Sequence, residues 1–272
     1  MTPHRLKLRF SPLLMIFLAL FALVVQGCFH SSSGGGKIGV TPDADPAGYY
    51  INTGTASVDD GASGTIDIND LQAMVHGDRI MMMSTAKGLL YDGIITSITG
   101  NAFMADFTIY TDGENPMNAT ASGTITTASS ITGTLTGAGV GSGIFSLLYD
   151  DTASNTEADL ARIKDREWDG DGAIGPNYAF TIDTQGVLAN TIKAGFNVPI
   201  FDFCEINGTV MPINGTSLYE VAATLTSCDV PAVNNTNYTG FAVSRTDSVM
   251  DDTLVLVLSN GAYSPNGELI VN

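Results

Sequence analysis

The sequence contains few of the side chains that carry catalysis, metal binding or nucleic-acid recognition. Its 272 residues include 3 histidines, 3 cysteines and 1 tryptophan, and only 11 lysine and arginine residues against 28 aspartates and glutamates. The formal net charge is -17. Such a chain is not expected to bind nucleic acid, because phosphates are held by lysine and arginine. Its acidic folded part is equally unsuited to docking on anionic lipid headgroups.

The shortage of histidine argues against nucleophilic catalysis. Beyond the first 28 residues only His30 and His76 remain. A serine hydrolase would have to use one of them, and the sequence has no Gly-x-Ser-x-Gly nucleophile elbow. We therefore expect no enzymatic activity of this kind and predict no cofactor. Met81, Met82 and Met83 are interpreted as core residues rather than as a binding surface for soft metals.

The N-terminal segment has the pattern of an export signal. Arg5, Lys7 and Arg9 precede an apolar run over residues 10–25, and Cys28 follows soon after. The run of about 16 residues is shorter than the roughly 20 of a membrane-spanning helix. The segment resembles the leaders of bacterial lipoproteins, which signal peptidase II cleaves before a lipidated cysteine. The resemblance implies a signal peptide over residues 1–27 and lipidation, including palmitate, at Cys28.

The residues after Cys28 resemble a lipoprotein tether. Residues 31–36 read Ser-Ser-Ser-Gly-Gly-Gly, so we predict a flexible segment over residues 28–48. Phe29 stands where an inner-membrane retention signal would have aspartate, and the resemblance therefore implies a bacterial outer-membrane location. Ordinary secretion of a cleaved chain is the alternative. Without the three basic residues of the leader, the net charge of -17 becomes -20.

The two remaining cysteines form an even pair. Cys204 and Cys228 are separated by 24 residues in a chain expected to reach an oxidising compartment. A disulfide between them is therefore the default expectation. Metal binding is the alternative, but neither a Cys-x-x-Cys spacing nor a nearby histidine supports it.

Short alternating runs separated by Gly, Asn and Asp dominate the rest of the chain and indicate antiparallel β-structure. Two stretches are expected to place one side chain in every two on a buried face: Phe103, Ala105, Phe107 and Ile109, and Tyr219, Val221, Ala223 and Leu225. We predict an all-β protein with two small antiparallel β-barrel or sandwich domains, over residues 49–150 and 168–272. One large barrel is the alternative.

A short helical segment is predicted between the two domains, over residues 151–167. Ser154 and Glu157 have the spacing of a capping box, and Leu160 and Ile163 follow as an apolar stripe. A recurring Gly-Thr-aliphatic pattern begins at Gly64, Gly123, Gly133 and Gly208. We interpret these glycines as the starts of strands, where a bulge or a sharp bend is needed.

One acidic cluster is a candidate for calcium binding. Asp169 and Asp171 lie beside Trp168 in an Asp-Gly-Asp-Gly sequence. An EF-hand loop counted from Asp165 would place Pro176 where a bidentate glutamate is required, so that pattern fails. The two aspartates remain candidates for a calcium site of another kind, with a plain Asp-Gly turn as the alternative.

The order of these elements resembles that of uncharacterised bacterial lipoproteins: a lipobox, a glycine-punctuated meander, a helix, Trp168 and a cysteine-bracketed hairpin. Tandem eight-stranded barrels are also similar in architecture to the lobes of transferrin-binding-protein-type surface lipoproteins. The predicted function is that of a lipid-anchored cell-envelope protein with a non-catalytic binding or structural role. Its expected partners are the membrane, through the lipid, and an envelope protein, a glycan or a small apolar ligand.

Two functions of other classes remain open at this point. The first is a carrier that holds a small apolar ligand inside a barrel, as eight-stranded barrels can. The second is a glycan hydrolase that uses a pair of carboxylates. A cavity inside a barrel would favour the first, and a deep cleft with two facing acids would favour the second.

Overall fold

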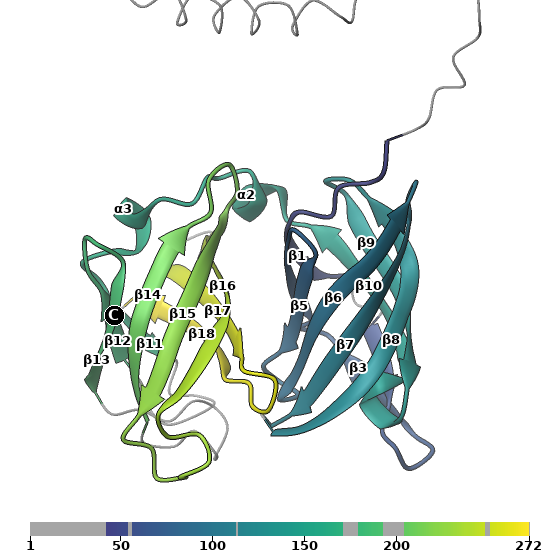
Figure 1. The fold of residues 1–272 in the computed structure, drawn as a ribbon. Helices are drawn as coiled ribbons and strands as arrows, with labels where there is room; N and C mark the ends of the chain where they lie inside the picture. The colour runs from purple at the N-terminus through teal and green to yellow at the C-terminus, as the bar shows by residue number, and fades with distance from the viewer. Residues whose placement is uncertain are drawn as a thin grey trace, which may run out of the picture. The chain divides into compact units, whose positions relative to one another are not determined.

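Among the residues that the structure describes, nearly all regular secondary structure is β-strand (Figure 1). The computed structural model describes residues 42–53, 56–112, 114–170, 179–192, 204–247 and 251–271. The predicted all-β class is confirmed, and the sheets are barrel-like. Across these described residues, no helix has the length and apolar character needed to cross a membrane. The predicted leader, Cys28 and most of the predicted tether lie outside the described residues.

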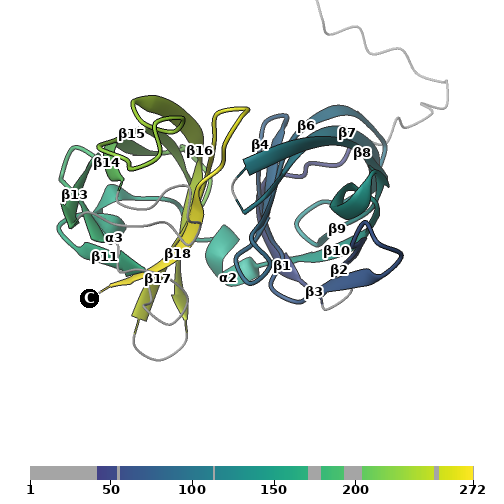
Figure 2. The same cartoon turned by 90° about the horizontal axis from the view of Figure 1, so that it is seen from below.

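The first sheet contains ten strands and closes on itself through a pairing of β1 with β10. Because β10 pairs with β1 near one end and with β2 near the other, these two short strands follow one another along the same side of β10. The strands from β4 to β10 form a simple meander, and Figure 2 shows them as a ring. The bounds are β1 (Gly48–Asn52), β2 (Ala56–Asp59), β3 (Thr65–Ile68), β4 (Gln72–His76), β5 (Arg79–Ser84), β6 (Leu89–Thr99), β7 (Ala102–Thr111), β8 (Glu114–Thr126), β9 (Ser130–Gly137) and β10 (Gly143–Tyr149), with the 3-10 helix η1 (Gly139–Gly141) before β10.

The second sheet is a closed barrel in which each strand pairs with the next and β18 returns to β11. Trp168 pairs with Val271 at this closure. The bounds are β11 (Glu167–Gly170), β12 (Ala179–Ile182), β13 (Val187–Ile192), β14 (Glu205–Pro212), β15 (Leu218–Thr226), β16 (Thr236–Asp247), β17 (Asp251–Ser259) and β18 (Asn266–Val271).

Each barrel has its own core, built from the alternating strands. The four predicted residues of β7 belong to the core of the first barrel, and the four of β15 belong to that of the second. Both predictions of a buried face are therefore confirmed. In the first barrel, η1 contributes Val140, whose carbonyl accepts a hydrogen bond from the Tyr91 hydroxyl at 3.1 Å. Trp168 is fully buried in the second core, where its indole nitrogen donates to the carbonyl of Ile163.

A third apolar cluster joins strands of the two barrels within the compact unit formed by residues 42–272. Met82 points into the first barrel, whereas Met81 and Met83 point outward into this third cluster. All three methionines are at most 1% exposed, so their interpretation as core residues is confirmed. The buried members of the cluster, called the inter-barrel cluster below, are Tyr49, Met74, Met81, Met83, Leu90, Tyr110, Ala153, Leu218, Phe241, Val243, Val255 and Val257.

The prediction that the Gly-Thr-aliphatic glycines mark strand starts is wrong for three of the four positions. Gly123, Gly133 and Gly208 lie inside β8, β9 and β14, and no register shift occurs at them. Gly133 pairs with both Gly123 and Phe145. A Cβ on Gly133 would lie 2.6 Å from Cζ of Phe145. The absence of a side chain therefore makes room for an aromatic ring in the barrel core.

The predicted capping box is also wrong. The segment between the sheets contains two single-turn helices, α2 (Asp151–Ser154) and α3 (Leu160–Ile163), which are capped by Asp150 and Asp159. Ser154 instead exchanges hydrogen bonds with the backbone of Tyr49, because its hydroxyl lies beside β1.

The remainder of this segment is held on the second barrel. Glu157 Oε1 accepts a hydrogen bond from the backbone N–H of Gly215, and the hydroxyl of Tyr219 exchanges hydrogen bonds with the backbone of Asp159. The segment is therefore packed rather than free.

The last residues of the predicted tether are likewise held by the first barrel. The backbone N–H of Ala44 donates to the carbonyl of Gly100 at 2.7 Å, and the Asp43 carboxylate accepts from the N–H of Gly100. Pro46 is buried, and its carbonyl accepts from the Tyr50 hydroxyl. The barrel therefore fixes the chain from about Asp43 onward, several residues before the predicted end of the tether at Gly48.

Candidate functional site

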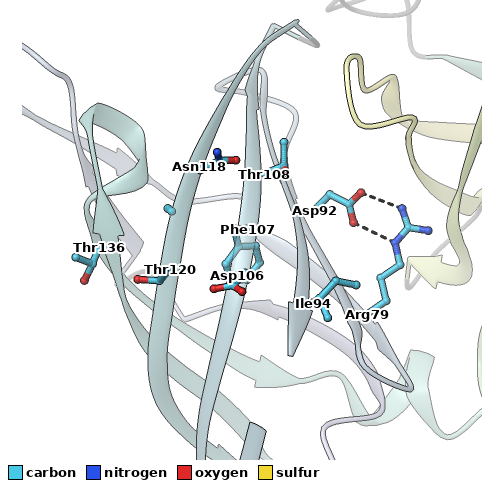
Figure 3. A pocket seen from close by; sticks show the side chains of 10 residues that line it. Arg79, Asp92, Ile94, Asp106, Phe107, Thr108, Asn118, Thr120 and Thr136 are labelled. Atoms are coloured by element: carbon cyan, nitrogen blue, oxygen red, sulfur yellow. Dashed lines mark hydrogen bonds and ion pairs between the residues drawn. The ribbon is translucent and has the colours of Figure 1, made fainter. Parts of the chain in front are cut away.

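An open hollow of about 710 Å³ lies on the outer face of the first barrel, over β5 to β9 (Figure 3). Its wall is built from two rows of side chains that run across the strands. The longer row is Arg79, Ile94, Asp106, Thr120 and Thr136, each paired with its neighbour on the adjacent strand. The shorter row is Asp92, Thr108 and Asn118.

The period of the strands explains why these residues share a surface. Successive side chains of a strand point to opposite faces, so Phe107 enters the core while Asp106 and Thr108 point outward. Five neighbouring strands in register then place one outward side chain each in the longer row. Four inter-strand spacings give this row a length of about 19 Å.

Most polar groups of the hollow are available to a ligand. Asp106, Thr120 and Thr136 are exposed, as is Asn118, and within the described part of the chain no side-chain hydrogen bond or ion pair engages them or Thr108. Their hydroxyl and amide groups can both donate and accept hydrogen bonds, and the carboxylate of Asp106 can accept them. Ile94 adds an apolar contact, because it is 46% exposed.

Arg79 and Asp92 differ from these free groups, because they form a two-point ion pair. Nε of Arg79 donates to Oδ1 of Asp92 and Nη2 donates to Oδ2, both at 3.0 Å. Figure 3 shows the two side chains facing each other at one end of the hollow. Such a pair fixes both the guanidinium plane and the carboxylate plane.

The second barrel contributes further contacts to this ion pair. Nη1 and Nη2 of Arg79 donate to the hydroxyl and the carbonyl of Thr239, each at 3.2 Å. Ser259 donates to Oδ2 of Asp92, and the Arg79 guanidinium lies 5.7 Å from the centre of the Phe241 ring. Almost all N–H groups of Arg79 are therefore engaged, which leaves little capacity to bind an anion.

A second hollow of about 410 Å³ also has Arg79 in its wall. His76 and Phe241 lie there in an edge-to-face contact, with ring centres 6.4 Å apart. Its other lining residues are Pro212, Ile213, Glu220, Thr239 and Gly240. This hollow therefore combines apolar and aromatic surface with one exposed carboxylate.

A partly buried polar network lies beside the inter-barrel cluster. The hydroxyl of Tyr49 donates to Gln72 and accepts from Arg245, and both Gln72 and Arg245 contact Glu268. Burial raises the pKa of the Tyr49 hydroxyl well above its ordinary value, an effect that the Arg245 charge opposes. Tyr49 and Gln72 are buried, whereas the Arg245 and Glu268 side chains are 20% and 34% exposed, so the network reaches the surface at Glu268.

The residues predicted from the sequence fall into three groups. Cys204 and Cys228 form the predicted disulfide, which closes the open end of the β14–β15 hairpin. Cys28 and Asp171 lie outside the described residues. Asp169 lies in β11, paired with Ala179 and Ile270. No group of three or more His, Cys, Asp or Glu residues that could hold a metal occurs in the part of the chain that the structure describes.

Sequence reasoning missed the hollow. Its residues come from five strands, and only the register between those strands places them in rows. A weak signal was present, because the outward positions of β8 and β9 from Asn118 to Thr136 carry hydroxyl and amide side chains and no charge: Asn118, Thr120, Ser122, Thr124, Thr126, Ser130, Thr132, Thr134 and Thr136. Comparison of the chain with known protein families, curated proteins and solved structures found no match.

Proposed function

We propose that this protein is a lipid-anchored component of the bacterial outer membrane with a non-catalytic binding role, and that its ligand is a neutral glycan held in the larger hollow. The anchor rests on the leader sequence and Cys28. The choice of ligand rests on one observation: two cross-strand rows of side chains, all polar except Ile94, line an open hollow, and most of the polar ones lack partners among the described residues.

The chemistry of the rows suits sugar hydroxyls. Asp106 accepts hydrogen bonds, the hydroxyls of Thr120 and Thr136 both donate and accept, and the amide of Asn118 does the same. Ile94 can pack against the C–H face of a sugar ring. Because Arg79 is already paired, the hollow carries the uncompensated charge of Asp106. An anionic polysaccharide is therefore disfavoured.

The two alternative functions have less support. The interior side chains of each barrel form a packed apolar cluster, which disfavours a carrier that holds its ligand inside. A glycan hydrolase needs two available carboxyl groups. Asp92 lines the hollow together with Asp106, but both of its oxygens already accept hydrogen bonds from Arg79.

The finer architecture is part of the same proposal. We propose that the chain forms two barrel domains, at residues 49–150 and 168–272, joined by the short segment that contains α2 and α3. In this arrangement the lipid at Cys28 holds the barrels close to the membrane, and residues 28–42 serve as the tether.

Titration of the full-length protein in detergent with neutral malto-, cello- and chito-tetrasaccharides tests whether the protein binds a neutral glycan. Thr120→Val keeps the shape of the side chain but removes its hydroxyl, so the affinity should fall by about 2- to 10-fold, the value of one hydrogen bond. Thr124→Val, on the same face of β8 but outside the hollow, is the matched control and should bind normally. Failure of every oligosaccharide to bind would refute the glycan proposal.

Metabolic labelling with a fatty-acid analogue tests whether Cys28 carries the proposed lipid anchor. The wild-type protein should carry the label and Cys28→Ala should not. Equal labelling of both proteins would show that Cys28 is not lipidated. Release of the unlabelled wild-type protein into the medium would instead support ordinary secretion.

A further inference from the structure

The two hollows meet at one side chain. Arg79 lines both the larger hollow on the first barrel and the smaller hollow beside Phe241 of β16. The larger hollow is lined by residues of β5 to β9, whereas most of the smaller one is lined by residues from Pro212 to Phe241 in the second barrel. The guanidinium of Arg79 therefore lies where the two binding surfaces adjoin.

We infer that the two hollows act as a single groove, and that the bound glycan is an extended chain that crosses Arg79 and contacts both barrels. This inference rests on the proposed function, because it extends the same site. It specifies the ligand class as an oligosaccharide or polysaccharide rather than a single sugar.

Arg79 is held in a fixed position between the two hollows. It contacts Asp92 of its own barrel and Thr239 of the other, and it is held over the ring of Phe241. A side chain held from both sides does not swing in and out as a gate. A ligand chain would therefore pass over the guanidinium without displacing it.

The sizes of the two surfaces favour a chain over a small molecule. Each hollow alone has the volume of an ordinary small-ligand site, at about 710 and 410 Å³. The longer row of the first hollow already covers about 19 Å. A ligand that used this row and the second hollow would need several sugar units.

The two surfaces also differ in a way that suits a glycan. The first offers mainly hydroxyl, amide and carboxylate groups, whereas the second offers Pro212, Ile213 and the His76–Phe241 pair together with the carboxylate of Glu220. A sugar ring has polar edges and apolar C–H faces. Successive units of one chain can therefore present an edge to the first surface and a face to the second.

An extended peptide is the less favourable occupant. The backbones of β6, β7 and β8 are paired on both sides, so the floor of the larger hollow has no free strand edge to which a peptide could add. Peptide sites also rely on pockets for large apolar or aromatic anchors. In the larger hollow Ile94 is the only large apolar side chain that the described structure exposes.

Chain-length dependence of binding tests the inference. The full-length protein in detergent is titrated with the disaccharide to the hexasaccharide of whichever neutral series binds. Affinity should keep rising beyond the tetrasaccharide. Glu220→Ala should weaken hexasaccharide binding by about 2- to 10-fold, through the loss of one hydrogen bond, and leave disaccharide binding unchanged. Asp229→Ala removes an exposed carboxylate elsewhere on the second barrel and should change neither.

These measurements distinguish failure of the single-groove inference from failure of the glycan proposal. If Thr120→Val weakens binding but affinity stops rising at the disaccharide and Glu220→Ala has no effect, the single groove is wrong and the glycan proposal stands. If no oligosaccharide binds, both fail together. Displacement of a bound hexasaccharide by an unrelated extended peptide would overturn the choice of ligand class.

Discussion

At the residue scale, buried tyrosine side chains make the stability of the fold depend on pH. Burial raises the pKa of Tyr49, Tyr50 and Tyr91 well above the ordinary value of about 10. The folded state therefore holds these hydroxyls protonated at pH values where an unfolded chain would ionise them. Their contribution to stability is complete below about pH 10 and is lost as the pH rises towards the folded-state values.

We accordingly expect the free energy of unfolding to fall steeply above about pH 10. Tyr91→Phe should cost about 1 kcal/mol at neutral pH, because it removes the hydrogen bond to Val140. The same variant should lose stability less steeply with alkaline pH, since one titrating group is gone. Urea unfolding at a series of pH values measures both effects, and an unchanged alkaline slope would contradict the assignment.

At the element scale, the β14–β15 hairpin shows how strand pairing and covalent chemistry support each other. Eight consecutive residue pairs join these strands, from Glu205 with Thr226 to Pro212 with Tyr219. Cys204 and Cys228 lie just beyond the first of these pairs, where they close the loop of 24 residues. Both cysteines also belong to the core of the second barrel.

Reduction of this disulfide should lower the free energy of unfolding by about 2–4 kcal/mol, chiefly because the unfolded chain gains freedom. Urea unfolding with and without a reductant measures the difference. A Cys204→Ala, Cys228→Ala double variant should match the reduced protein and show no response to the reductant. A response of the double variant would point to another target of reduction.

The same scale shows what the sequence could and could not predict. The alternation of apolar and polar residues identified the buried faces of β7 and β15, because the opposite face of each strand is largely exposed to solvent. Continuous apolar runs such as residues 80–83 and 254–258 lack alternation, since both of their faces are buried. A continuous apolar run therefore marks a strand that packs against the other barrel. The hydroxyl-rich outward positions of β8 and β9 were visible in the sequence, but the hollow itself was not predictable from them, because its rows depend on a register that no single strand encodes.

At the scale of the whole molecule, the inter-barrel cluster makes the two barrels depend on each other. Its twelve buried side chains come from both sheets and from α2. Separating the sheets would expose them, and each large apolar side chain exposed costs about 1.5–3 kcal/mol. The contacts of Arg79 with Thr239 add polar interactions at the same junction.

We therefore expect residues 42–272 to unfold in one cooperative transition, with equal calorimetric and van't Hoff enthalpies. Met81→Asp places a charge in the inter-barrel cluster and should split the transition into two. Met104→Asp, on the same barrel at a side chain that is 57% exposed, is the matched control and should leave one transition. Two transitions in the wild-type protein would show that the junction is weak.

The inter-barrel cluster also has a consequence for biogenesis. The first barrel ends at Tyr149, so its strands are synthesised before any of β16 or β17 is present. During that interval Met74, Met81 and Met83 have nothing to cover them, and exposed apolar strands promote aggregation. A holding chaperone, or very rapid synthesis of the remaining chain, would then be needed. A chain truncated after residue 150 should accumulate as aggregates, and Met81→Lys should make it more soluble.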